Sequence, residues 1–287
     1  MSVNTRTLDH IVHLTPPGSL EETTEQFKKL GFNVIPGGTH AGGLTANALV
    51  VLADGIYLEL IFFTHPESDY PPGSPEREKR DANPWSHKPY GWIDYAFLGN
   101  GSHQESIAGI INERAKKDGS GAAYLQEQDG GRTRPDGEVL KWLISAPEQN
   151  QRRGTLPFFC GDVTPRTLRV PSDPPANTVH PSTAQGIAHV RILTDNLSLI
   201  GISKQLTSVI GNEPNSSNDN EVVWSLDSVH LATNAPRLYL SAPSTDAENQ
   251  YVSDVGTGIY EVGFRIQKGK AGSVMTPYGK IAWILEE

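Results

Sequence analysis

One pattern repeats along this chain: a short apolar strand, an amphipathic helix and three further strands. The first copy begins with "DHIVHLT". A helix follows, which Ser19 and Glu22 are spaced to cap as a capping box and which should end at Gly31. The strands "FNVIP", "NALVVLA" and "GIYLELIFF" come next, the last two joined by a turn at Asp54-Gly55. This order of elements defines a β-α-β-β-β unit.

Three more copies of the unit follow. The second begins at Gly91, carries a helix capped near Ser102 that runs to Gly119, and closes with the strand "VLKWLISAP". The third begins at Gly186, has a helix near residues 196–210, and closes with "RLYLSAP". The fourth runs from "GIYEVGFRI" to "TPYGKIAWILEE" and lacks its helix. The chain is therefore expected to contain three full units and one abridged unit.

A proline-rich segment, "VTPRTLRVPSDPPANTVHPS", separates the second and third units. Proline disfavours a regular helix or a central strand, so a linker is predicted over residues 166–182. A single unit cannot bury its own sheet face, and pairing of units is therefore expected. We predict an α+β fold of tandem βαβββ modules paired into two curved mixed sheets. Residues 1–165 would form a complete pair and residues 183–287 a reduced pair.

The first strand of each unit carries one polar side chain in the same frame of its alternation. These four residues are His10, Asp94, His189 and Glu261. Their neighbours of opposite parity, such as Val190 and Ile192, are apolar and suit the covered face of a sheet. His13 breaks that apolar pattern in the first strand. By the same alternation Glu59 shares the open face with Tyr57, so these polar side chains should line the concave side of the sheets.

Composition excludes several classes of function. The formal charge of −9 argues against a nucleic-acid surface, which needs clustered Lys and Arg. No apolar run approaches the roughly 20 residues of a membrane helix, and the start "MSVNTRT" has no apolar signal core. The single cysteine, Cys160, cannot form an internal disulfide, which fits a reducing compartment such as the cytoplasm. With no cationic neighbour in the sequence, Cys160 is expected to be buried rather than nucleophilic.

The duplicated unit resembles the vicinal oxygen chelate superfamily, whose paired units form a cup that commonly holds a divalent metal. More closely, "LDHIVHL", "LGFNVIPGGTH", "NALVVLADGIYLELI", "RTRPDGEVLKW" and "LPFFCGD" resemble the glyoxalase-like domain family over residues 7–165. In the superfamily, ligands come from the first and last strands of each unit. The resemblance therefore implies His10, Glu59 and Asp94 as metal ligands.

The sequence also departs from the superfamily pattern. The counterpart of Glu59 in the second unit falls near Leu143, which cannot bind a metal, so the four-ligand set of true glyoxalase I is absent. The family's usual Gly-Thr-x-Asn reads Leu44-Thr45-Ala46-Asn47, although His40 and Asn47 remain.

Two interpretations of the first cup follow. His10 and Glu59 could bind a divalent ion (Zn, Fe, Mn, Ni or Mg), with Asp94 or water completing the shell. Alternatively, His10 and Glu59 form a hydrogen-bonded pair in a metal-free pocket, with Glu59 as general base. Glu59 and His40 are the expected catalytic residues, and Asn47 and Tyr57 the expected substrate contacts.

The glycine-rich segment "PGGTHAGGLTAN" lacks the Gly-Lys-Ser/Thr ending of a phosphate-binding loop. We expect it to be a mobile loop over the mouth of the cup, from which His40 and Asn47 reach the substrate. The plainer alternative is a strand connection in which Asn47 caps a turn.

The leading hypothesis is a metal-dependent enzyme that acts on a small oxygen-bearing organic substrate. A lyase or isomerase is favoured, and a hydrolase or dioxygenase stays open. The alternative is a metal-free protein that binds or sequesters a small molecule, supported by the incomplete ligand set and the apolar cup residues Ile61, Ala96 and Leu143. Activity is expected wholly in the first half, with His189 and Glu261 as a reduced copy of the site. The expected partners are a small molecule and at most a second copy of the chain, as a monomer or homodimer.

Overall fold

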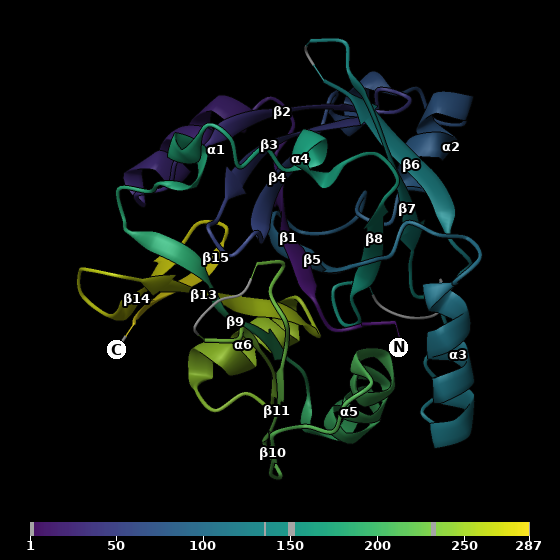
Figure 1. Ribbon diagram of the computed structural model, residues 1–287, viewed down its shortest axis with the longest axis vertical. Coiled ribbons are helices and arrows are strands. Elements are labelled where there is room, and N and C mark those ends of the chain that lie inside the picture. Colours follow the sequence, from purple (N-terminus) through teal and green to yellow (C-terminus); the bar gives the residue numbers. More distant parts are fainter. Residues whose placement is uncertain (1–2, 135, 149–152, 231–233, 287) are drawn as a thin grey trace.

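The computed structural model describes residues 3–134, 136–148, 153–230 and 234–286. The first half of the chain closes into an eight-stranded barrel, and the second half forms a seven-stranded sheet (Figure 1). Parallel and antiparallel pairs occur in both. The predicted α+β fold with two mixed sheets is confirmed.

Eight strands form the barrel, in the order β1-β4-β3-β2-β6-β7-β8-β5. They are β1 (Leu8–Thr15), β2 (Ile35–His40), β3 (Thr45–Val51), β4 (Tyr57–Phe63), β5 (Gly91–Leu98), β6 (Gln128–Thr133), β7 (Val139–Ser145) and β8 (Phe158–Asp162). The connecting helices are α1 (Leu20–Lys29), the short η1 (Glu67–Asp69), α2 (Pro75–Asp81) and α3 (Ile107–Asp118). β1 runs parallel to β4, and β5 runs parallel to β8, whereas β1 and β5 pair antiparallel.

The second unit ends on a different strand from the one expected. "VLKWLISAP" forms β7, which is antiparallel to both of its neighbours, and β8 from "LPFFCGD" is the strand that runs parallel to β5. Both segments have an apolar strand pattern, so their sequences alone do not show which of them pairs with β5. Leu143 on β7 is therefore not the counterpart of Glu59, and that expectation was wrong.

The second sheet has the order β10-β11-β12-β9-β13-β15-β14. Its strands are β9 (Ala184–Leu193), β10 (Ser216–Ser217), β11 (Glu221–Ser225), β12 (Arg237–Ser241), β13 (Gly258–Ile266), β14 (Gly272–Thr276) and β15 (Gly279–Leu285). The helix expected near residues 196–210 is α5 (Asn196–Ile210). Within the described chain no helix separates β13 from β14, as predicted, but α6 (Asp246–Asp254) precedes β13 and was not foreseen.

Two helix starts differ from the expected caps. Ser19 is the N-cap of α1, but its hydroxyl donates to the Pro16 carbonyl at 2.7 Å instead of capping the helix. α3 begins at Ile107 behind Ser106, whose hydroxyl accepts from the Gly109 amide at 3.0 Å. Ser102 was the expected cap, but its hydroxyl accepts from backbone amides of the preceding turn. In both helices a serine precedes the first turn, as expected. The contacts of the preceding turn determine whether its hydroxyl accepts from a helix amide.

The predicted linker is not free of helix. It contains the short helix α4 (Arg166–Arg169) and the 3-10 turn η2 (Pro175–Thr178). Arg169 is only 4% exposed, because buried carboxylates of the barrel hold its guanidinium. Arg169 therefore fixes this helix to the barrel.

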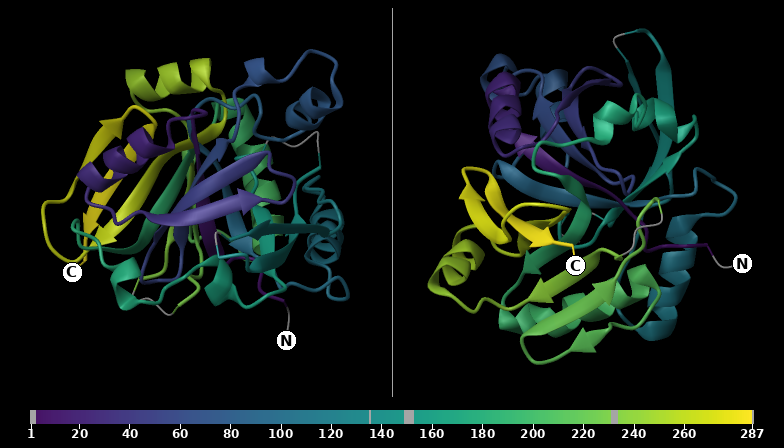
Figure 2. Two further views of the ribbon diagram at one scale, coloured as in Figure 1. Left: turned by 90° about the horizontal axis from the view of Figure 1, so that it is seen from above. Right: turned by 60° about the vertical axis from the view of Figure 1, so that its left-hand side comes forward.

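One apolar core joins the two halves, which lie next to each other in Figure 1 and in the right-hand view of Figure 2. Tyr95 and Phe97 point outward from β5 and belong to the same buried cluster as Val262 and Phe264 of β13. At the turn between β3 and β4, the Asp54 carboxylate accepts from the Ile187 amide and from Arg265, both at 2.9 Å. The apolar face of the second sheet is thus covered by the outside of the barrel.

Candidate functional site

A cavity of about 1370 Å³ is lined by strands of the barrel and by residues of the second half. It is larger than the roughly 300–1,000 Å³ of most small-molecule sites. The excess arises because α6 and the start of β13 also line it, through residues such as Tyr251 and Thr257. The second half therefore contributes part of the wall, which the sequence did not indicate.

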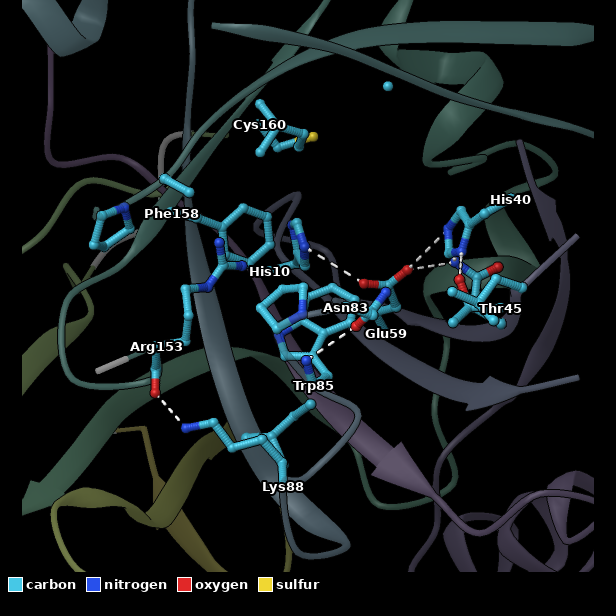
Figure 3. A pocket seen from close by; sticks show the side chains of 18 of the residues that line it. His10, His40, Thr45, Glu59, Asn83, Trp85, Lys88, Arg153, Phe158 and Cys160 are labelled. Carbon is cyan, nitrogen blue, oxygen red and sulfur yellow. Dashed lines mark hydrogen bonds and ion pairs between the residues drawn. The ribbon is translucent and has the colours of Figure 1, made fainter. Parts of the chain in front are cut away.

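Glu59 lies at the centre of the polar groups deep in this cavity (Figure 3). Its Oε1 accepts from Asn47 Nδ2 at 2.6 Å and lies 3.4 Å from His40 Nε2, while Oε2 lies 3.7 Å from His10 Nε2. Burial alone would raise the pKa of Glu59. The hydrogen bond and charge of His40, the charge of His10 and the Asn47 hydrogen bond outweigh burial and lower that pKa to about 2. Glu59 is therefore a fixed anion at neutral pH.

The glycines of "PGGTH" allow two strands to approach closely. A Cβ on Gly37 would lie 1.9 Å from Asn47 Oδ1, and the Gly38 amide donates to that oxygen at 3.1 Å. Residues 35–40 and 45–51 are paired strands, so the expectation of a loop over the mouth was wrong. The side chains of His40 and Asn47 nevertheless line the cavity.

His40 is held at both ring nitrogens. Nδ1 is 2.8 Å from Thr45 Oγ1, and Nε2 faces Glu59 and Asn47. The protein therefore fixes the orientation of the ring, and the ring lowers the pKa of the Glu59 carboxyl.

Asp9 was missed by sequence reasoning, and it controls His10. Asp9 is fully buried, and its Oδ2 accepts from His10 Nδ1 at 2.7 Å. Arg169 Nη1 donates to the same carboxylate at 2.9 Å, and Arg166 also pairs with it. Burial would raise the pKa of Asp9, but the charges of these two arginines hold it well below its usual range. The ionised Asp9 fixes the proton of His10 on Nδ1, which leaves Nε2 directed at Glu59.

Tyr57 forms the floor beneath His10. The two rings stack with centroids 4.7 Å apart, and the Tyr57 hydroxyl accepts from Arg169 at 2.8 Å. Tyr57 was predicted as a substrate contact. It lines the cavity, but its hydroxyl is already engaged by the protein.

The structure gives Asp94 a different task from metal ligation. Its Oδ2 accepts from Arg153 Nε at 2.7 Å and from Trp85 Nε1 at 2.9 Å. Its Oδ1 accepts from the backbone amides of Gly154 and Tyr95 at 3.1 and 3.0 Å. Among the described residues, no hydrogen bond or ion pair joins Asp94 to His10 or Glu59. The carboxylate is committed to orienting Arg153 and Trp85.

These donors do not fit a resident divalent ion. Catalytic zinc normally takes three protein ligands. His10 and His40 face different oxygens of Glu59, so the three side chains do not converge on one point (Figure 3). In the described part of the chain no group of three or more His, Cys, Asp or Glu side chains is arranged to hold an ion.

The strand register identifies Cys160 as the counterpart of Glu59. Both lie two residues beyond the parallel neighbours of His10 and Ala96, which pair with each other across β1 and β5. The Cys160 thiol lines the cavity, and burial raises its pKa, so it is a neutral wall residue. The first unit therefore supplies the polar pair, and the second unit supplies Ala96 and Cys160 in its place.

His189 and Glu261 form a separate pair on the second sheet, outside the residues that line the cavity. His189 Nε2 lies 2.8 Å from Glu261 Oε1, and Lys280 donates to Oε2 at 2.8 Å. Burial would raise the pKa of Glu261, but these two partners lower it to about 2. The pair is an internal ion cluster rather than a second copy of the site.

A family model described as a glyoxalase-like domain matches residues 8–206. The match extends beyond the barrel, through β9 and most of α5, whereas the sequence resemblance was recognised over residues 7–165. No curated protein sequence matches this chain. In the described residues, no helix is both long and apolar enough to cross a membrane.

Several solved structures share the fold. A hypothetical protein from Staphylococcus aureus has a TM-score of 0.66 at 11% identity, over 98% of this chain and 99% of that one. A mutant 4-hydroxymandelate synthase from Streptomyces coelicolor has a TM-score of 0.55 at 11% identity, over 93% and 72%. A fusion of a xylose isomerase-like TIM barrel and a 4-hydroxyphenylpyruvate dioxygenase gives 0.51 at 12% identity, over 93% and 37%. At such identities the likeness shows the fold alone.

Proposed function

Because this chain belongs to the glyoxalase-like domain family, we propose that its barrel is the active site of an enzyme that moves a proton on a small, oxygen-bearing organic substrate. One observation carries the proposal: His10 Nε2 and Glu59 Oε2 face each other across 3.7 Å in the cavity. This distance is too long for a hydrogen bond, and among the described residues no hydrogen bond reaches either atom. One polar or acidic group of a substrate that lies beside the pair can be within hydrogen-bond distance of both atoms.

His10 is the general base of the proposed reaction. With Nδ1–H held by Asp9, the lone pair on Nε2 accepts a proton from the substrate, as in other carboxylate-oriented imidazoles. Glu59 stays ionised throughout, because its pKa is about 2. Its negative charge stabilises the imidazolium that forms, and its Oε2 accepts a hydrogen bond from a substrate hydroxyl. His40 acts as a positioning residue for Glu59.

The reaction class that follows is proton abstraction next to a carbonyl, as in an isomerase or lyase. No step is assigned to a metal ion, because the donors do not converge. Full activity after dialysis against EDTA would support this mechanism. Loss of activity that a divalent ion restores would return His10 and Glu59 to the role of ligands.

Solvent exchange tests the proton transfer without knowledge of the natural substrate. Phenylpyruvate and hydroxyacetone both carry exchangeable C–H bonds next to a carbonyl, and NMR in D₂O follows their loss. We expect the wild type to exceed His10→Asn and Glu59→Gln by about 100-fold or more on at least one probe. The matched control is His65→Asn, since the His65 side chain is 65% exposed. A wild type no faster than His10→Asn on both probes contradicts the proposal.

A second function, sequestration of a small molecule without turnover, is favoured by the apolar part of the cavity wall. Ile93, Trp142 and Phe158 are buried in one cluster and also line the cavity. Stoichiometric binding of a probe without any exchange of its protons would support sequestration over catalysis.

A further inference from the structure

The guanidinium of Arg153 packs against two aromatic rings that line the cavity. Its guanidinium carbon lies 4.5 Å from the centroid of the Phe158 ring and 5.7 Å from that of Trp85. Figure 3 shows the guanidinium extending toward Phe158, on the side where His10 lies. Its Nε is the only nitrogen of the group that donates a hydrogen bond to another described residue, namely Asp94. In the part of the chain that the structure describes, the two terminal nitrogens donate to no protein acceptor and form a fork that faces the cavity.

A buried carboxylate, that of Asp94, holds Arg153 in this position. Asp94 is fully buried and accepts four hydrogen bonds, from Arg153, Trp85 and two backbone amides. Such a carboxylate is rigid, and it fixes both the guanidinium and the indole beside it. A planar guanidinium with two free terminal nitrogens matches a carboxylate through two parallel hydrogen bonds.

Phe158 connects this fork to the proposed base. The Phe158 ring lies 5.3 Å from the His10 ring, centroid to centroid, and edge-on to it. The base and the guanidinium therefore contact the same aromatic side chain, and one small molecule can reach both. The fixed charge of Glu59 repels an anion. The buried arginines that also line the cavity, Arg132 and Arg169, already donate to protein oxygens, which favours Arg153 as the contact of a carboxylate.

From these contacts we infer that the cavity takes a small organic acid with a flat apolar body. Its carboxylate binds the Arg153 fork, its body lies against Phe158 and Trp85, and its acidic C–H bond is directed to His10. The assignment of the C–H bond rests on the proposed function; the carboxylate anchor does not. Asp94 is a positioning residue for this anchor.

Binding of two matched probes tests the anchor. Benzoate and benzamide have the same ring and nearly the same shape, and they differ in charge. In calorimetric titrations we expect the wild type to bind benzoate at least about tenfold more tightly than benzamide. Arg153→Met should abolish this preference, and Arg153→Lys should retain part of it. The control Arg237→Met changes an exposed arginine on β12 and should leave the preference unchanged.

His10→Asn separates the two proposals. The preference for benzoate should survive in this variant, because the anchor needs no proton transfer. In the wild type, a preference for benzoate without proton exchange on either probe supports the anchor and contradicts the proposed reaction, whereas exchange without the preference does the reverse. Equal binding of both probes by the wild type, or an unchanged preference in a folded Arg153→Met or Arg153→Lys variant, overturns the inference.

Discussion

Asp9 and His10 are adjacent in β1, yet their side chains hydrogen-bond to each other at 2.7 Å. Neighbouring residues of a regular strand point to opposite faces of the sheet. The pairing of β1 with β5 shifts register between Leu8 and His10, and such a bulge turns a side chain away from its regular direction. A local irregularity of the strand thus brings an orienting carboxylate to the imidazole.

The first prediction separates this orienting role from the ion pairs of Asp9. Asp9→Asn replaces the charged, acceptor-only partner of His10 Nδ1–H with a neutral amide that can also donate to the ring, so proton exchange should fall by roughly 10²- to 10⁴-fold. Asp162→Asn is the matched control, because Asp162 pairs with Arg169 and Arg166 and does not contact His10. Exchange rates and melting temperatures of both variants decide the matter. An equal loss of exchange in the two variants would mean that the arginines, rather than the imidazole, need Asp9.

We predict that the free energy of unfolding depends on pH through Glu59. Its folded pKa of about 2 lies below the ordinary value of 4.5, so its contribution to stability is present above pH 4.5 and is lost as pH falls toward 2. Glu59→Gln should therefore cost on the order of 3 kcal/mol at pH 7 and much less at pH 3. Urea unfolding at both pH values measures the difference. The exposed Glu138→Gln should show no such dependence, and a constant cost for Glu59→Gln would contradict the assigned charge.

Glu261→Gln tests whether the second sheet takes part in the reaction. Glu261 pairs with His189 and Lys280 and lies outside the cavity wall, so proton exchange should stay close to that of the wild type. Glu59→Gln, measured beside it, should lose exchange. Comparable damage in both variants would place the active cup on the second sheet, or between the two.

Strand periodicity predicted which side chains face the barrel interior. His10, Tyr57 and Glu59 line the cavity, because the alternation of side chains along a strand is a local property. The helix over residues 196–210 was predicted for a similar reason, since its apolar face and its glycine terminator lie within one short window.

Contacts between distant segments could not be predicted in this way. Asp94 was expected to line the cup, but it lies behind Trp85 and Arg153, which do line the cavity, and its partner Arg153 is 59 residues further along the chain. Arg169 reaches Asp9 across 160 residues, from a segment that the sequence marked as a linker. Contacts between distant segments also determine that β8, and not β7, pairs with β5. The residues that orient the site could therefore be identified only from the structure.

The last prediction concerns His13, the residue that breaks the apolar pattern of β1. Its side chain is fully buried against Phe27, Trp92 and Tyr278, in edge-to-face contacts with ring centroids 4.9 to 5.2 Å apart. Neither ring nitrogen has a hydrogen-bond partner among the described residues. Burial lowers the pKa of His13 from 6.5 to about 3, so the folded protein keeps the ring neutral.

The unfolded chain takes up a proton at His13 below pH 6.5, whereas the folded chain does not until about pH 3. Stability from this site is therefore present above pH 6.5 and is lost as pH falls toward 3. His13→Leu removes that loss, so its advantage over the wild type should be about 2 kcal/mol larger at pH 5 than at pH 8. Urea unfolding at the two pH values measures this, with His103→Leu as control because that side chain is 59% exposed. An advantage of His13→Leu that is the same at pH 5 and pH 8 would show that His13 is not held neutral in the folded protein.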